Sequence, residues 1–404
     1  MLAVACLSIR LEAQEAGVMT YTVVDSIAGA VGGVSVDRGG DIYVADFRDN
    51  VWKVRPDGRL SLFATGFYGA SGNTIDGAGN LFQSSFFGNY VSRVNRLGEH
   101  EVYASRGLQG PVGLAMDAVG NLYVNNCTGN TISVVRPDRS VETFAADTLL
   151  NCPNGLTIDP DGNLYVVNFR DERMLKVSPE GEVTDFASLP GGGNGHVTFA
   201  RGALIATSFQ GHRVYRVSLT GDVTLLAGTG ERGETDGSTD VATFSWPNGI
   251  AAGPSGDRVY INDFVNRFPP TVALPPIPRS SLRMIKLPSF ADILAEALRS
   301  GGLEEMVAAY RRFKAEPATA STFTEIDVNR FGYQLMQNGQ LSAAVEVLKL
   351  NAQSYPNSFN VYDSLAEAYM LVGESQMAIV NYTKSLELNP ANANAQEKLN
   401  ELRR

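Results

Sequence analysis

The sequence contains neither a long apolar run nor a cluster of basic residues. No stretch approaches the roughly 20 apolar residues that cross a bilayer, so no membrane span is expected. The 43 acidic side chains outnumber the 33 basic ones, which gives a formal net charge of −10 at pH 7. Because nucleic acids and anionic membranes attract clustered positive charge, neither is expected as a partner.

Two common enzyme motifs are absent or incomplete. There is no Gly-x-Ser-x-Gly elbow, because Gly69-Ala70-Ser71-Gly72 lacks the spacing that exposes a serine nucleophile. Residues 228–233 do match Gly-x-Gly-x-x-Gly after a strand, but no helix follows whose N-terminus could hold a phosphate. A serine hydrolase and a dinucleotide-binding enzyme are therefore disfavoured.

The N-terminus lacks the basic residues that begin a complete signal peptide. Residues 1–9 are nevertheless apolar, and residues 11–16 offer small side chains near a possible cleavage site. We expect residues 1–18 to be a signal segment of an exported protein, periplasmic or secreted. The alternative is a disordered tail on a cytoplasmic protein.

Glycine is abundant before residue 303 and marks a repeat. Variants of the phrase Gly-Asn-Leu-Tyr-Val begin at six glycines: Gly40, Gly79, Gly120, Gly162, Gly202 and Gly256. The strands before the first five phrases are aligned at Asp37, Asp76, Asp117, Asp159 and Phe199, which are 39 to 42 residues apart. A period near 40 residues with four short strands per unit is typical of a β-propeller blade.

Six such units predict a six-bladed β-propeller over residues 19–287. The sixth unit shows only three strands, near Gly249 to Ala252, Val259 to Asp263 and Leu282 to Leu287. The β-branched segment Tyr21 to Val24 precedes the first blade and is otherwise unassigned. We expect a strand near residues 21–25 to close the ring, which removes an exposed sheet edge.

After residue 287 the apolar periodicity changes from that of strands to that of helices. Matching residues recur 34 positions apart, the tetratricopeptide (TPR) period: Gly339 and Gly373, Ala344 and Ala378, Pro356 and Pro390. We expect a linker or the start of a helix over residues 288–300 and a TPR-like helical domain over residues 301–404 that binds a protein or a peptide. The predicted fold class is β plus α, a six-bladed propeller followed by a helical superhelix.

The blades resemble NHL-repeat propellers and, more broadly, the regucalcin and gluconolactonase-like superfamily. The most specific match runs through residues 224–230, Asp236-Gly237, residues 242–244 and Pro247-Asn248-Gly249-Ile250. The resemblance implies the fold more than one activity, because these propellers host lactonases, lyases, receptors and scaffolds.

A ring of polar residues is expected around one mouth of the propeller channel. The residue that closes each second strand is Asp46, Ser85, Asn126, Asn168, Ser208 or Asp263, and the next is Phe47, Phe86, Cys127, Phe169, Phe209 or Phe264. Such a mouth could hold a partly apolar small molecule. Alternatively, each polar side chain caps its own turn and each phenylalanine fills a gap between blades. Asp46 and Asp263 are either a carboxylate pair, with Arg48, Arg170 and Arg267 nearby, or solvated turn charges.

A second ring reads Gly32, Ser71, Val112, Asn154, Asn194 and Asn248. In regucalcin-like enzymes an asparagine at the Asn154 position helps a glutamate and an aspartate to bind a divalent metal. By this resemblance the glutamate position holds glycine, and the aspartate position holds Asn194 or Asn248. Hard cations are normally bound by carboxylates as well as carbonyl oxygens. Asn154, Asn194 and Asn248 therefore remain as neutral candidate ligands for Ca²⁺, Mg²⁺ or Zn²⁺, and the alternative is that Pro-Asn-Gly is a plain turn.

His196 is the candidate catalytic residue. It is aligned with Val34, Leu114, Leu156 and Ile250, and Asn73 fills the same slot in the second blade. Two polar residues that line one channel from opposite blades could transfer a proton or hold a water. The alternative is a structural histidine that is hydrogen-bonded to neighbouring carbonyls.

Cysteine is scarce, with three in 404 residues, but two lie at informative places. Cys127 follows the second strand of the third blade, and Cys152 precedes the first strand of the fourth. A disulfide across this loop of about 25 residues would contribute roughly 3 kcal/mol and would fit an oxidising compartment. Two reduced, partly buried thiols are the alternative.

The function that these residues favour is a non-catalytic scaffold that binds ligands at the propeller face and proteins at the helical array. The acids of a metal-dependent enzyme are absent from their expected positions. The alternative is a metal-assisted hydrolase or lyase of the gluconolactonase-like kind that acts in the central channel, so whether the protein is an enzyme is left open.

Overall fold

A computed structural model describes residues 17–265, 278–315 and 324–403. The chain divides into two compact units, of which the first ends at Leu287 and the second begins at Pro288. The predicted signal segment, apart from its last two residues, and the proline-rich segment 266–277 lie outside the described residues.

The first unit contains five blades of four antiparallel strands each. The strands are β2 (Val34–Val36), β3 (Ile42–Ala45), β4 (Asn50–Val54) and β5 (Leu60–Thr65); β6 (Ala70–Ile75), β7 (Leu81–Ser85), β8 (Tyr90–Val94) and β9 (His100–Ala104); β10 (Pro111–Met116), β11 (Leu122–Asn126), β12 (Thr131–Val135) and β13 (Val141–Ala146); β14 (Pro153–Ile158), β15 (Leu164–Asn168), β16 (Arg173–Val177) and β17 (Val183–Ser188); β18 (Asn194–Ala200), β19 (Ala203–Ser208), β20 (Arg213–Val217) and β21 (Val223–Ala227).

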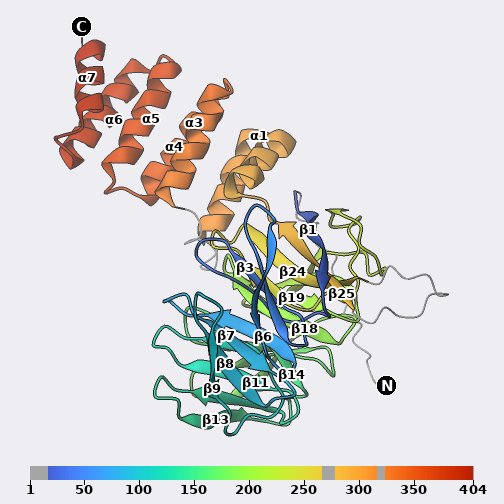
Figure 1. Ribbon diagram of the computed structural model, residues 1–404. Coiled ribbons are helices and arrows are strands. Elements are labelled where there is room, and N and C mark those ends of the chain that lie inside the picture. The colour runs from blue at the N-terminus through green and yellow to red at the C-terminus, as the bar shows by residue number, and fades with distance from the viewer. Residues whose placement is uncertain (1–16, 266–277, 316–323, 404) are drawn as a thin grey trace, which may run out of the picture. The chain divides into compact units, whose positions relative to one another are not determined.

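The sixth blade joins the two ends of the propeller sequence. Its strands are β23 (Ile250–Ala252), β24 (Arg258–Val265), β25 (Arg279–Lys286), β1 (Met19–Ala28) and the short β22 (Gly237–Ser238), in that order across the sheet. The segment expected to close the ring lies in β1, which pairs antiparallel with β25 from Met19 opposite Lys286 to Ala28 opposite Arg279 (Figure 1). The six-bladed propeller is thereby confirmed.

The repeated phrase has a local cause. Asp76 Oδ1 accepts hydrogen bonds from the backbone N–H groups of Ala78 and Asn80 at 2.9 and 2.8 Å, and Asn80 Nδ2 donates to Asp76 Oδ2 at 2.8 Å. Gly79, in the same turn, has φ 83°, a left-handed conformation that glycine adopts without strain. Asp117 with Asn121 and Asp159 with Asn163 repeat the arrangement. The Gly-Asn pair is therefore a turn that begins the second strand.

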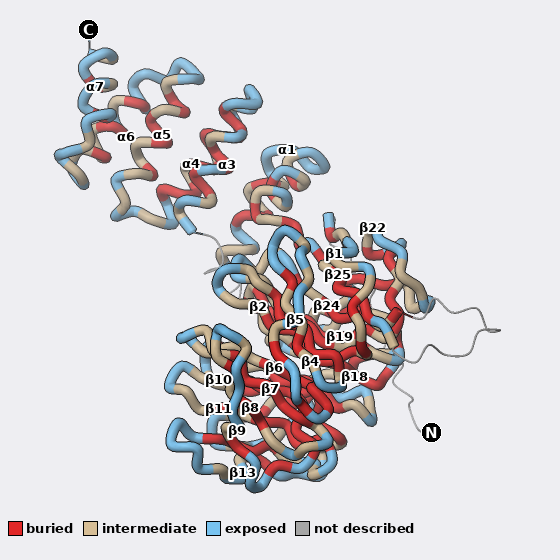
Figure 2. Tube along the Cα trace, viewed as in Figure 1, coloured by how far each residue is buried: buried red, intermediate tan, exposed pale blue. Residues whose placement is uncertain are grey.

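Burial decreases from the inner to the outer strands of a blade. In the second blade every residue of β7 is buried, whereas β9 is mostly exposed. Figure 2 shows the same gradient, with buried inner strands and an exposed periphery. The apolar side chains between blades form separate clusters, such as the one that joins Leu156 and Leu175 to Ala115 and Ile132 of the preceding blade.

The second unit is helical. Its helices are α1 (Phe290–Ala315), α3 (Glu325–Gln337), α4 (Leu341–Ser354), α5 (Phe359–Leu371), α6 (Ser375–Leu388) and α7 (Ala393–Leu402). The starts of α3, α4 and α5 each precede those of α5, α6 and α7 by 34 residues. One apolar core that includes Leu348, Leu365 and Tyr382 joins the helices. The fold class, β plus α, is confirmed, and the assignment of the helices to the TPR class stays a prediction. No described helix is long and apolar enough to span a membrane.

Candidate functional site at the channel mouth

The residues of the predicted polar ring lie at or near the ends of the second strands, and their side chains are buried. Asp46 Oδ1 accepts from the backbone N–H groups of Arg48 and Asn50 at 2.8 and 3.0 Å, which caps its own turn. Asn168 Oδ1 accepts from Asn151 N at 3.1 Å, and Ser208 Oγ donates to Pro190 O at 3.0 Å. Asn126 Oδ1 accepts from Gln109 N at 3.0 Å. These four side chains therefore hold turns and interblade connections.

Asp263 is the most deeply placed carboxylate of the ring. Its side chain has no exposed surface, and its two oxygens accept from Ser245 N at 2.8 and 3.0 Å. Burial raises the pKa of Asp263 to about 7, although the nearby guanidinium group of Arg283 acts in the opposite direction. Asp46 and Asp263 thus have separate partners, and neither carboxylate is free to receive a polar ligand in this arrangement.

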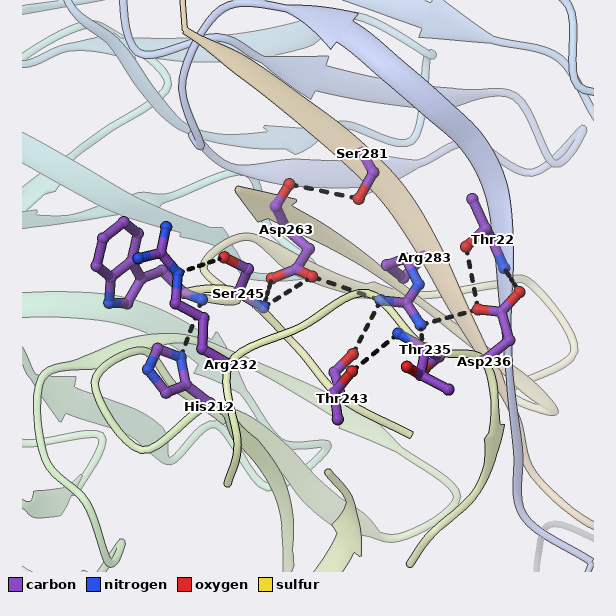
Figure 3. Close-up of polar contacts among 11 residues, drawn as sticks. Thr22, His212, Arg232, Thr235, Asp236, Thr243, Ser245, Asp263, Ser281 and Arg283 are labelled. Atoms are coloured by element: carbon purple, nitrogen blue, oxygen red, sulfur yellow. Dashed lines mark hydrogen bonds and ion pairs between the residues drawn. The ribbon is translucent and has the colours of Figure 1, made fainter. Parts of the chain in front are cut away.

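Arg283 is a buried cation that the sequence alone did not single out. Its guanidinium group donates to the carbonyl oxygens of Thr243 and Thr235 at 3.1 and 2.9 Å, and to Asp236 Oδ1 at 2.8 Å (Figure 3). It also lies 3.5 Å from Asp263 Oδ2. Since Thr235, Asp236 and Thr243 belong to the long connection between β21 and β23, Arg283 anchors that connection to the sixth blade.

Around the channel axis, five glycines let neighbouring blades touch through their backbones. A Cβ atom at Gly33, Gly72, Gly113, Gly155 or Gly249 would lie 2.2 to 2.7 Å from backbone atoms of the next blade. None of the five has a positive φ, so close approach rather than backbone freedom requires glycine here. A second row of buried side chains bonds adjacent blades: Ser84 to Val112 O, Asn125 to Asn154 O and Thr207 to Asn248 O.

His196 belongs to this glycine ring, which corrects its predicted alignment. Val197, and not His196, pairs with Ala206 in the way that Leu114 pairs with Val124 and Leu156 with Val166. Asn194 likewise takes the place of Pro153, while Gly195 takes that of Asn154. The predicted alignment was wrong by one residue because the fifth blade has Ala200 where the first four blades have the aspartate that follows the first strand.

The imidazole of His196 is buried. Its backbone N–H donates to Asn248 O at 3.0 Å, whereas its Nε2 atom has no hydrogen-bond partner among the described residues. Burial lowers the pKa of His196 to about 4. The side chain is therefore neutral at pH 7, and no carboxylate in the described part of the chain is hydrogen-bonded to orient it as a catalytic base.

The asparagines proposed as metal ligands use their amide nitrogens to hold backbone. Asn154 Nδ2 donates to Asn194 O at 3.0 Å, Asn194 Nδ2 to Asp171 O at 3.2 Å, and Asn248 Nδ2 to Val31 O at 3.1 Å. The side-chain oxygens of Asn194 and Asn248, like that of Asn73, are buried and lack partners among the described residues. Asn73 Nδ2 donates to Gln83 Oε1. No group of three His, Cys, Asp or Glu side chains suited to a metal exists in residues 17–265, 278–315 and 324–403.

An aromatic rim surrounds the mouth. We define it as Phe47, Phe86, Phe169, Phe209, Trp246 and Phe264, all half-buried, together with the disulfide between Cys127 and Cys152. Ring centroids are 5.8 Å apart for Phe47 and Phe86, 5.7 Å for Phe169 and Phe209, 6.1 Å for Phe209 and Trp246, and 5.6 Å for Trp246 and Phe264. Phe86 and Phe169 pack against the disulfide. The disulfide therefore connects the pair Phe47 and Phe86 to the series of rings that begins at Phe169. The rim therefore includes a residue from every blade.

Trp246 is the rim residue that sequence analysis missed. It has φ 62°, in the left-handed region, and Cys152 has φ 51° at the equivalent place before Pro153. Three other blades have glycine there, at Gly69, Gly110 and Gly193, each with positive φ. A non-glycine residue in this conformation costs about 1–2 kcal/mol, and such strain is often retained at functional positions. The signal was available, because Trp246-Pro247-Asn248-Gly249 matches Cys152-Pro153-Asn154-Gly155.

Two side chains position Trp246. The Arg232 guanidinium carbon lies 3.7 Å from the centre of the indole ring, a cation–π contact, and Arg232 Nε donates to Ser245 Oγ at 2.9 Å. The Trp246 backbone N–H donates to His212 Nδ1 at 3.2 Å. In other blades an asparagine is the equivalent acceptor: Asn89 for Gly110 N and Asn130 for Cys152 N. Burial and then the charges of Arg232 and Arg213 lower the pKa of His212.

Comparison with known proteins identifies the fold. No protein-family model matches the chain, and no curated protein matches it. A gluconolactonase from Xanthomonas campestris superposes with a TM-score of 0.54 at 19% identity, covering 68% of this chain and 91% of its own. A streptogramin B lyase superposes with a TM-score of 0.50 at 14% identity, covering 68% of this chain and 100% of its own. An auxiliary nutrient binding protein from Bacteroides thetaiotaomicron superposes with a TM-score of 0.55 at 12% identity, covering 66% of this chain and 76% of its own. The propeller fold is thus related to that of gluconolactonase and lyase structures, and one fold can host unrelated activities.

Proposed function

We propose that the propeller is a non-catalytic binding module whose small-molecule ligand rests on the aromatic rim. The observation that carries the proposal is the series of contacts between half-buried aromatic side chains, Phe47 with Phe86 and Phe169 with Phe209, Trp246 and Phe264 in turn. Partly apolar mouths of this kind are typical ligand sites. The strained backbone of Trp246 also favours the rim as the ligand site, because glycine would adopt this conformation without strain.

The polar groups beneath the rim support binding over catalysis. Asp46, Asn126, Asn168 and Ser208 are committed to backbone groups, and Asp263 is sealed against Ser245 and Arg283. A general acid or base must be within hydrogen-bond reach of the substrate. None of these carboxylates or amides is presented in that way.

A ligand screen on three variants separates the rim from the channel. Hits from a small-molecule library should survive Asn154→Ala and His196→Ala and should be lost in Trp246→Gly. Because three blades carry glycine at the Trp246 position, this variant is expected to fold. Hits that survive Trp246→Gly and disappear in the two channel variants would overturn the proposal and move the ligand to the channel.

The second candidate is a hydrolase or lyase that acts in the channel with His196 as the proton carrier. It is supported by the unpartnered Nε2 atom of this neutral imidazole and by the related fold of a gluconolactonase. The test is turnover of lactone substrates with and without calcium, magnesium, manganese and zinc. Turnover that is lost in His196→Ala would support it, and no turnover with unchanged thermal stability in all four metals would eliminate it.

We further propose that the helical unit is a TPR domain that binds a protein or a peptide. Its support is the 34-residue offset shared by the helix pairs and the left-handed Gly339 and Gly373, whose φ angles are 73° and 84°. Selection from a peptide library on the full chain tests it, and failure to enrich any sequence would count against it.

We also propose export, because the Cys127–Cys152 disulfide suits an oxidising compartment. Finding the protein in the cytoplasmic fraction would contradict export.

A further inference from the structure

One arc of the aromatic rim has exposed arginine side chains beside it. The arc consists of Phe169, Phe209, Trp246 and Phe264, whose rings are in sequential contact. Arg232 is exposed and lies over Trp246, and Arg170 is exposed directly after Phe169. Within the described residues, the Arg232 guanidinium group contacts Ser245 and Trp246 rather than a carboxylate.

Two acidic residues of the neighbouring loop also lie near this arc and accept hydrogen bonds there. Asp171 accepts from Asn151 Nδ2 at 3.0 Å and lies 3.7 Å from Arg173. Glu172 accepts from Gly191 N at 3.3 Å. Arg213 adds a further cation, whose Nη2 atom donates to Thr229 O at 2.7 Å. Glu231 directly precedes Arg232 and Glu234 follows it by two residues, so a test of charge must take both acids into account.

Aromatic rings and a guanidinium group favour a particular class of ligand. A flat apolar body gains contact area and quadrupole interactions against Trp246 and Phe209. Arginine binds planar anions such as carboxylates through paired N–H donors, and the charge-assisted bond is stronger beside an apolar surface than in open water.

We propose that this arc binds an aromatic or amphipathic organic anion, with its rings against Trp246 and its anionic group at Arg232. The proposal rests on the rim being the ligand site and adds the chemical class of the ligand. It requires that the charge of the ligand contributes to affinity, a property that the apolar rim alone would not confer.

The test compares two fluorescent probes of similar shape and different charge. They are the anion 1-anilinonaphthalene-8-sulfonate and the uncharged N-phenyl-1-naphthylamine. The chain has two tryptophans, Trp52 and Trp246, so the test uses a Trp52→Phe background in which quenching reports on Trp246. We expect the anion to quench Trp246 at a concentration at least about tenfold lower than the neutral probe does, which corresponds to roughly 1.4 kcal/mol.

Two substitutions assign the effect. Arg232→Gln should remove most of the preference for the anion and leave the affinity of the neutral probe within about twofold. Arg59→Gln is the matched control, because Arg59 is an exposed arginine that pairs with Asp57 in a turn between β4 and β5. It should change neither affinity. Near-ultraviolet circular dichroism verifies that each variant is folded.

The outcomes separate the two proposals. Equal affinity for the two probes, or an equal loss of both in Arg232→Gln, overturns the preference for anions and leaves the rim as the site. The rim site itself is overturned if neither probe quenches Trp246. It is also overturned if a Trp246→Gly variant, in which binding is measured by the emission of the probe, binds both probes as tightly as before.

Discussion

Arg283 and Asp236 are 47 residues apart in sequence, and their side chains meet with a separation of 2.8 Å between Nη2 and Oδ1. Asp236 also accepts from the backbone N–H and the hydroxyl of Thr22 on β1, at 2.9 and 3.0 Å (Figure 3). One carboxylate therefore joins the strand that closes the ring, the third strand of the sixth blade and the connection that carries Trp246. Closure of the propeller and placement of the rim depend on the same contacts.

Replacing Arg283 with methionine should destabilise the propeller by about 3–5 kcal/mol, because removal of one partner of a buried ion pair leaves Asp263 without its countercharge. Asp236→Asn, at a carboxylate with 45% of its side-chain surface exposed, should cost about 1 kcal/mol or less. Urea unfolding of both variants measures the difference. Equal stability of Arg283→Met and the native protein would show that the buried cation does not hold the long connection.

Gly113→Ala should destabilise the propeller by about 1–3 kcal/mol. The added Cβ atom would lie 2.2 Å from Asn154 O of the next blade, and because the other near atoms, Leu156 N at 2.9 Å and Gly155 C at 3.1 Å, are also backbone, the neighbour cannot relax easily. Gly77→Ala is the control, since its Cβ would lie 3.8 Å from the nearest heavy atom, at the end of the Arg38 side chain. Thermal unfolding of the pair checks the prediction, which fails if the two alanines have the same effect.

His196 should make the propeller sensitive to acid. Its pKa is lowered to about 4 in the folded protein, from 6.5. As the pH falls, the imidazole of His196 is therefore protonated in the unfolded chain before it is protonated in the folded protein. The neutral imidazole favours the folded state fully above about pH 6.5, and this stabilisation decreases toward pH 4. A lowering of the pKa of this size corresponds to a stability change on the order of 3 kcal/mol.

His196→Gly tests that contribution, because glycine occupies the same place in the other five blades. Denaturant unfolding at pH 7, 5.5 and 4.5 should show a shallower loss of stability in the variant than in the native protein. Parallel curves would mean that other groups cause the acid sensitivity.

The hydrogen bond between His212 and Trp246 should also depend on pH. Nδ1 accepts from the Trp246 backbone only while it is unprotonated, and burial together with Arg232 and Arg213 lowers the pKa of His212. The bond is therefore intact above about pH 6.5 and is lost as the pH falls through the lowered pKa. In the Trp52→Phe background, Trp246 fluorescence should change over this acidic range.

His212→Asn is the matched variant, because Asn89 and Asn130 make the equivalent bond in two other blades. It should keep the bond and make Trp246 fluorescence independent of pH between 8 and 5. If the native protein and His212→Asn respond identically to acid, then His212 is not the titrating group.

The repeat could be recognised from the chain because its causes are local. Asp76, Gly79 and Asn80 form their turn within five residues, so the same letters recur wherever the turn does. The closing strand was predictable for a related reason, since the sixth unit lacked a strand and the β-branched segment at Tyr21 to Val24 had no other place. The 34-residue offset of the helices was visible in the same way.

The site depended on contacts that local patterns do not encode. The chemistry of Asp46, Asn126, Asn168 and Asp263 could be listed from the sequence, but their hydrogen bonds to turns and neighbouring blades are seen only in the fold. The slip of one residue at His196 has the same origin, because Ala200 removed the local marker and only pairing with β19 restores the register.

The sequence by itself thus determined the number of blades, the order of the strands and the change to helices, because hydrophobic period and turn residues act over short distances. Only the tertiary structure decided which polar groups are already bonded, that His196 lies in a ring of glycines and that Trp246 joins the aromatic rim beside Arg232. These properties arise where strands from different blades meet, and packing between distant segments is what places their side chains together.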